Sequence, residues 1–169
     1  GGDALGLYQF HRPDPAVPYE DSVGAIRDLL DEGVIRLAGI SNANPEQIRQ
    51  ARDILGGRLA SVQNQFSPAF RSSEPELRLA DELGIAFLPW SPLGGISRAG
   101  ELGDRFAPFS EIASARGISP QVVALAWQLA QSPHVIPIPG SSRPETILDS
   151  ITAVDVELTP EELTRLDAA

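Results

Sequence analysis

Polar or aromatic residues follow several short apolar runs of this chain. They are His11, then Ser41 and Asn42, then Gln63, then Trp90 and Ser91, and finally Ser141, Ser142 and Arg143. Asn and Gln amides both donate and accept hydrogen bonds, serine hydroxyls add further bonds, and an indole face stacks on a flat ring. Such a set suits a ligand with a carboxamide ring, and an arginine beside serines at a helix start suits a phosphate. Taken singly, Ser, Asn and Gln at these places are ordinary turn formers and helix caps.

Apolar runs alternate with amphipathic segments along the chain, and this alternation places the polar residues. Strands are predicted at 5–10, 34–40, 59–63, 85–90 and 135–139. Helices are predicted over 21–32, 109–116 and 121–131. Three more are predicted to end at Leu55, Leu83 and Ile151, and a last short one follows Thr159. Start signals for helices stand at Asn44, Ser73, Ser119 and Thr159, with capping boxes expected at Ser73 and Thr159. The alternation is typical of βα units on a parallel sheet, whose strand ends meet at one rim.

Two architectures fit this pattern. A length of 169 residues favours an open doubly wound sheet, because a complete (β/α)₈ barrel takes about 250 residues. The motifs favour part of a barrel, since no G-x-G-x-x-G follows any strand. We expect one domain over 1–169, with a functional loop in the long irregular stretch 91–108.

Composition excludes several classes of protein. A net charge of −10 argues against a nucleic-acid surface, and no apolar run or leader pattern indicates a membrane span or signal peptide. We therefore expect a cytoplasmic protein. Cysteine is absent, and His11 and His134 are too few for a zinc site, so no metal is expected. All 13 cationic residues are arginine.

Five segments, in order, resemble motifs of the aldo-keto reductase family. They are LYQFHRPDP at 7–15, GISN at 39–42, VQNQFSP at 62–68, WSPLGG at 90–95 and IPGSSRPE at 138–145. The resemblance implies a (β/α)₈ TIM barrel, of which the chain holds roughly the last five βα units. It also implies an NADP(H)-dependent oxidoreductase that reduces small aldehydes or ketones.

The resemblance assigns roles by position. His11 matches the catalytic histidine that orients the substrate carbonyl. Ser41, Asn42 and Gln63 match the residues that hold the nicotinamide carboxamide, and Trp90 matches the aromatic that stacks on the nicotinamide ring.

The remaining matches concern the phosphates and the adenine. Ser91, Pro92, Leu93 and Gly94 match the loop along the pyrophosphate. Gly140, Ser141, Ser142 and Arg143 match the stretch that meets the 2′-phosphate, and Asp149 or Ser150 stands near the adenine contact.

One part of the family pattern is missing. The family's catalytic group also contains Asp, Tyr and Lys from earlier strands, whereas this chain has no lysine, and Tyr8 and Tyr19 stand outside the acid's position. A tyrosine acid needs a nearby cation to lower its pKa. We therefore expect a fragment of a longer enzyme that is inactive alone.

Two other classes of function stay open. The chain could be a non-catalytic nicotinamide-binding or regulatory relative, or a half-barrel assembly module whose open strand edges favour self-association. A phosphate-binding barrel of the isomerase or aldolase type would need a catalytic Lys or Glu at a strand end, and none is found.

Overall fold

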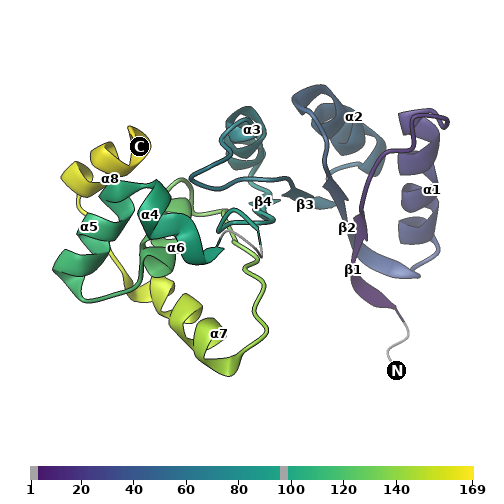
Figure 1. Ribbon diagram of the computed structural model, residues 1–169. Helices are drawn as coiled ribbons and strands as arrows, with labels where there is room; N and C mark the ends of the chain where they lie inside the picture. Colours follow the sequence, from purple (N-terminus) through teal and green to yellow (C-terminus); the bar gives the residue numbers. More distant parts are fainter. Residues whose placement is uncertain (1–3, 96–98) are drawn as a thin grey trace. The chain divides into compact units, whose positions relative to one another are not determined.

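The computed structural model describes residues 4–95 and 99–169, which divide into two compact units (Figure 1). Of the described residues, the first unit holds 4–64 and 73–88, and the second holds 65–72, 89–95 and 99–169. Among the described helices, none has both the length and the apolar character needed to cross a membrane.

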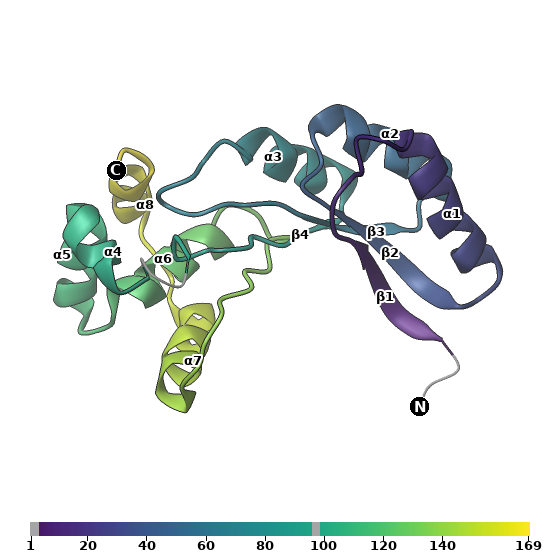
Figure 2. The ribbon, with the colours of Figure 1, turned by 45° about the vertical axis from the view of Figure 1, so that its right-hand side comes forward.

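The first unit is a parallel α/β unit. Its strands are β1 (Leu5–Phe10), β2 (Ile35–Ser41), β3 (Leu59–Gln63) and β4 (Ala86–Phe87), hydrogen-bonded in the order β1-β2-β3-β4. Its helices are α1 (Tyr19–Asp31), α2 (Pro45–Leu55) and α3 (Glu74–Leu83), which lie on the same side of the sheet (Figure 2). The predicted parallel α/β arrangement is confirmed, and β1 and β3 have the predicted bounds.

The sheet face toward the helices is apolar. Ile40 pairs with Val62, which pairs with Phe87, and all three side chains are buried. Burying a side chain of this size contributes about 1.5–3 kcal/mol, so this row is a main source of the unit's stability.

A polar row crosses the other face of the sheet. Gln9 pairs with Gly39, which pairs with Ser61. The Gln9 Nε2 donates to the carbonyl of Ile40 at 2.7 Å, and the Ser61 Oγ donates to Gln9 Oε1 at 3.0 Å. A Cβ at Gly39 would overlap Gln9 Oε1 and Ser61 Oγ. Only glycine lets the two side chains meet across the middle strand.

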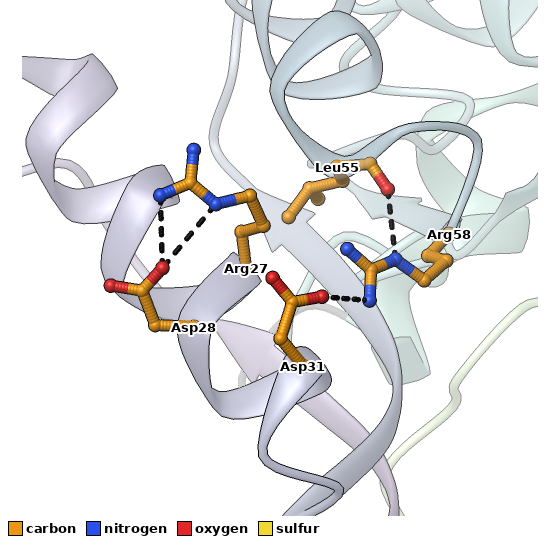
Figure 3. Close-up of polar contacts among 5 residues, drawn as sticks. All are labelled: Arg27, Asp28, Asp31, Leu55 and Arg58. Atoms are coloured by element: carbon orange, nitrogen blue, oxygen red, sulfur yellow. Dashed lines mark hydrogen bonds and ion pairs between the residues drawn. The ribbon is translucent and has the colours of Figure 1, made fainter.

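A surface contact joins the end of α1 to the start of β3 (Figure 3). The Arg58 guanidinium donates to the carboxylate of Asp31 at 2.7 Å and to the carbonyl of Leu55 at 3.1 Å. Arg27 forms a second ion pair with Asp28, its neighbour on α1. The Arg58 and Asp31 side chains are 38% and 57% exposed, so their pair is worth at most about 1 kcal/mol.

The second unit is mainly helical. Its elements are η1 (Ala99–Glu101), α4 (Leu102–Arg105), α5 (Ala107–Arg116), α6 (Pro120–Leu129), α7 (Pro144–Ile151), η2 (Thr152–Asp155) and α8 (Pro160–Asp167). Helix α6 is the most buried of them, because every residue from Val122 to Gln128 is buried. The long stretch 91–108, expected to be irregular, contains η1 and α4 and the start of α5, and its residues 96–98 lie outside the described part.

Trp127 on α6 organises one side of this unit, as a core residue should. Its ring stacks on Phe66 with centroids 5.4 Å apart and meets the Phe109 ring edge-on at 6.0 Å. Its indole N–H donates to the Asp167 carboxylate at 2.8 Å, and the Arg71 guanidinium lies over the ring at 4.6 Å. One side chain thus joins segment 65–72, α5 and α8 to α6.

Three of the four predicted helix starts have the expected side-chain cap. Asn44 and Thr159 form complete capping boxes, and the Ser119 Oγ accepts from the backbone N–H of Val122. The capping box expected at Ser73 is wrong: its backbone has φ −91° and ψ 16°, not the extended conformation of a capping residue, and its side chain makes no cap bond.

The cap of α8 is reinforced from α5. The Arg116 guanidinium donates to both carboxylate oxygens of Glu162, whose side chain also accepts from the Thr159 backbone. These donors, Arg116 first, lower the pKa of Glu162.

The strand predicted over 34–40 is shifted by one residue to β2, and two other predicted strands are lost or shortened. Residues 135–139 form no named strand, because Pro137 and Pro139 have no N–H to donate and the backbone N–H of Ile138 donates to the carbonyl of Pro89 at 3.2 Å. The strand predicted over 85–90 shrinks to β4, although the Leu88 N–H still donates to Val62 and Trp90 forms an isolated bridge with Gln65.

The substitution Gly39→Ala should destabilise the first unit by about 1–3 kcal/mol, because the added methyl group displaces Gln9 and Ser61. Urea unfolding followed by circular dichroism measures this loss. Gly6→Ala on β1 is the matched control, because no atom lies within 4 Å of its added Cβ. Equal unfolding midpoints for the two variants would contradict the overlap.

Candidate functional site

In the first unit, hydrogen bonds join the carboxyl ends of β1, β2 and β3. The Ser41 Oγ donates to the carbonyl of Gln63 at 2.5 Å, and the Asn42 backbone N–H donates to the same carbonyl at 3.1 Å. The Asn42 Nδ2 donates to the carbonyl of His11 at 3.0 Å and to the Ser41 Oγ at 3.1 Å. The structure therefore brings the predicted residues His11, Ser41, Asn42 and Gln63 together.

Asn42 has an unusual backbone at this edge. Its φ of 56° lies in the left-handed region, which asparagine tolerates better than most residues. In this conformation the Asn42 side chain reaches back to the preceding strand end while its own N–H bonds to the following one. The strained residue is thus held from both sides.

Some side chains at this edge are hydrogen-bonded within the chain, and others are not. The Ser41 hydroxyl is buried, donates once and accepts once. The side chains of His11 and Gln63 make no hydrogen bond within residues 4–95 and 99–169, and the His11 side chain is exposed. The imidazole and the Gln63 amide are therefore free to bind a ligand.

In the second unit, the Pro92 loop (Ser91–Gly94) follows Trp90 and is tightly bent. Ser91 has φ 50° and Gly94 has φ 86°. The Gly94 N–H donates to the carbonyl of Ser91 at 2.9 Å, and the Gln128 Nε2 donates to the carbonyl of Pro92 at 2.9 Å. The loop is therefore fixed by a bond within itself and by one from α6.

A cavity of about 600 Å³ lies in the same unit. Its lining combines apolar and polar residues: Leu93, Ala99, Gly100, Gln121, Gly140, Ser141, Ser142, Arg143, Thr146, Asp149 and Ser150. The structure thus brings one residue of the Pro92 loop, Leu93, together with the whole predicted stretch 140–143 and with Asp149 and Ser150. Trp90, Ser91, Pro92 and Gly94 do not line this cavity.

The cavity wall carries a positive charge directly before α7, at Arg143, and a negative charge within this helix, at Asp149. Arg143 directly precedes α7, is exposed, and forms no ion pair within the described residues. The hydroxyls of Ser141 and Thr146 lie within hydrogen-bond distance of each other and of the carbonyl of Arg143, and their two hydrogens are shared among these contacts. A guanidinium next to a helix N-terminus attracts an anionic group.

Ser119, which the sequence predicts only as a helix cap, holds the opposite charge of Asp149 in place. The Ser119 Oγ donates to the Asp149 carboxylate at 2.6 Å while accepting the N–H of Val122. This bond connects α6 to α7 and leaves the other Asp149 oxygen to accept from a ligand. No local pattern predicts it, because Ser119 and Asp149 are 30 residues apart.

The sequence predicts that the site residues share one rim, and in the structure these residues belong to two units. His11, Ser41, Asn42 and Gln63 belong to the first unit, and Trp90 with residues 91–94, 140–143, 149 and 150 belong to the second. Within the described residues, no cluster of three or more His, Asp or Glu side chains is placed to hold a metal ion.

Comparison with known proteins gives consistent matches. The model of the Aldo/keto reductase family matches residues 1–169. An uncharacterised oxidoreductase of Schizosaccharomyces pombe is 32% identical over 169 residues, which cover 99% of this chain and 53% of that protein. Pyridoxine 4-dehydrogenase of Escherichia coli is 31% identical over 148 residues, covering 88% and 49%. The chain spans about half the length of the curated relatives it matches.

The fold agrees with solved structures. An aldo-keto reductase of Klebsiella pneumoniae, in complex with NADPH, matches with a TM-score of 0.84 and 28% identity over 98% of this chain and 58% of that chain. Such reductases are (β/α)₈ TIM barrels, so the parallel α/β arrangement described above is part of a barrel of this type. From the match over all 169 residues and the relatives above 30% identity, the chain belongs to the aldo/keto reductase family.

Proposed function

We propose that this chain carries the NADP(H)-binding part of an oxidoreductase that transfers hydride between nicotinamide and an aldehyde or ketone. The observation that carries the proposal is the cavity lined by Leu93, Arg143 and Asp149, whose charges and size suit an adenosine phosphate. The NADPH complex of the Klebsiella pneumoniae relative supports it.

The wall residues have the chemistry that the adenosine end needs. Arg143 and the N–H groups that begin α7 would hold the 2′-phosphate, with Gly140, Ser141 and Ser142 around it. Asp149 and Ser150 would face the adenine, where the Asp149 carboxylate can accept from an amino group.

The other predicted contacts concern the pyrophosphate and the nicotinamide. The backbone of the Pro92 loop, with Leu93 at the cavity, would follow the pyrophosphate. Trp90 would stack on the nicotinamide ring. Ser41, Asn42 and Gln63 would hold its carboxamide, with the unbonded Gln63 amide as the freest donor and acceptor.

The bound cofactor would supply or accept the hydride, and His11 would orient the substrate carbonyl. The chain supplies no evident general acid. It has no lysine, and the buried Tyr19 hydroxyl has its pKa raised to about 12 by loss of solvent, which makes it a poor proton donor near neutral pH. We therefore propose that the chain alone binds cofactor without reducing a carbonyl compound.

An assembly role is the second candidate, and the surface of β1 and β2 favours it. Within the described residues β1 pairs only with β2, so its other edge has free backbone groups. Leu7 and Leu37 are register partners and are 44% and 46% exposed. This edge would accept further strands, from a second copy or from another chain.

NADPH should quench the intrinsic tryptophan fluorescence of the chain in a saturable way, because the nicotinamide would cover Trp90. The variant Trp90→Phe should lose this signal, while Trp127, buried against Phe66, gives the reference emission. A chain that is folded by circular dichroism and shows no response to NADPH would refute cofactor binding by this chain.

Replacing Arg143 by alanine should weaken NADPH binding by roughly 10- to 100-fold, since a charge-assisted bond to the 2′-phosphate is lost. NADH, which lacks this phosphate, should bind equally to both proteins. Arg49→Ala removes the same charge from an exposed site on α2 and is the control. Equal losses for NADPH and NADH would argue against a 2′-phosphate contact.

Self-association should depend on the β1 edge. Sedimentation of the chain over a concentration series should show oligomers, and Leu7→Glu should convert them to monomers, because a carboxylate would have to be buried at the contact. Leu148→Glu, at an equally apolar exposed position of α7, should have no such effect. A chain that is monomeric at every concentration contradicts this role.

A further inference from the structure

Gln128 is a polar residue in the most buried helix of the second unit. Its side chain is 0% exposed, next to the buried Trp127. The Gln128 Nε2 donates to the carbonyl of Ala124, one turn earlier in α6, at 3.1 Å, and to the carbonyl of Pro92 at 2.9 Å. One amide group thus connects the core of α6 to the Pro92 loop.

The orientation of this amide is determined by its neighbours. Both contacts are carbonyl oxygens, which only accept hydrogen bonds, so the NH₂ end must face them. The Gln128 Oε1 is buried and has no partner within the described residues. An unpaired buried acceptor is unfavourable, and an apolar side chain of similar size would avoid it. What distinguishes Gln128 from such a side chain is its bond to Pro92.

The loop that receives this bond holds a strained backbone. Ser91 is a non-glycine residue with φ 50°, a conformation that persists where its surroundings enforce it. The Gly94 N–H closes the turn onto the Ser91 carbonyl, and Pro92 lies between them with no N–H of its own. The Pro92 carbonyl is therefore the point at which the core can hold the turn.

We propose that Gln128 is a positioning residue for cofactor binding: it fixes the Pro92 carbonyl and so keeps the Pro92 loop in its bent form. Leu93, the next residue, lines the 600 Å³ cavity and packs against the apolar cluster of α6. A loop held in this form places the Gly94 turn and Leu93 before the cofactor arrives, which lowers the ordering cost of binding. The inference rests on the proposed function.

The test uses Gln128→Met, which keeps the length of the side chain and removes the donor. Amide hydrogen exchange measured by NMR should be about tenfold faster at Gly94 in the variant, and the dissociation constant for NADPH should rise about tenfold. Val123→Ala is the control, because Val123 is a core residue of α6 outside the apolar cluster that Leu93 contacts. It should leave Gly94 exchange and NADPH affinity within about twofold of the parent.

The outcomes separate this inference from the proposed function. Failure of the parent chain to bind NADPH refutes the proposed function, and Gly94 exchange still tests Gln128. A folded Gln128→Met variant with parental Gly94 exchange overturns the inference. If the variant does not fold, exchange of the two Gln128 side-chain amide hydrogens in the parent decides. Protection of both hydrogens, one bonded to Ala124 and one to Pro92, supports the bond to Pro92, and exchange of either as fast as at the exposed Gln50 amide overturns it.

Discussion

The parallel pairing of β1 to β4 is the constraint on which the first unit depends. Parallel strands need a crossover between each pair, and the helices that provide it lie on one side of the sheet. The pairing also aligns Gln9, Gly39 and Ser61 across three strands. Because Gly39 has no side chain, the side chains of Gln9 and Ser61 can form a hydrogen bond across it. At the carboxyl ends, the same register brings Asn42 within reach of His11 and Gln63.

The second unit depends instead on the burial of α6. Consecutive residues of this helix serve different neighbours: Trp127 holds segment 65–72, α5 and α8 together, and Gln128 holds the Pro92 loop. Ser119, at the start of α6, holds Asp149 on α7. One buried helix therefore makes hydrogen bonds both to the Pro92 loop and, through the residue at its start, to Asp149.

The candidate residues differ in how many of their polar groups are already hydrogen-bonded within the chain. The side chains of Ser41 and Asn42 already form hydrogen bonds that join strand ends. The side chains of Gln63 and Arg143 and one oxygen of Asp149 can still form hydrogen bonds with a ligand. An edge that is bonded before a ligand arrives is rigid, which limits the ordering that binding has to impose. For proton transfer the chain offers least, because it has no lysine and the Tyr19 hydroxyl is buried.

Local patterns in the sequence were sufficient for much of the fold. Apolar runs located β1 and β3, and cap residues located the starts of α2, α6 and α8, because these features depend on neighbours within a few residues. Of the site residues that the motifs predict, four meet in the first unit and seven line the cavity of the second. Where a local pattern conflicted with the backbone, as at Ser73 and at residues 135–139, the prediction was wrong.

Only the tertiary structure decided the contacts between distant residues. The bonds from Gln128 to Pro92, from Ser119 to Asp149 and from Ser61 to Gln9 join positions 30 to 52 residues apart. Each of these residues reads alone as an ordinary core, cap or strand residue. Their roles arise because folding places a donor beside an acceptor, and a pattern confined to a few neighbouring residues carries no information about such a meeting.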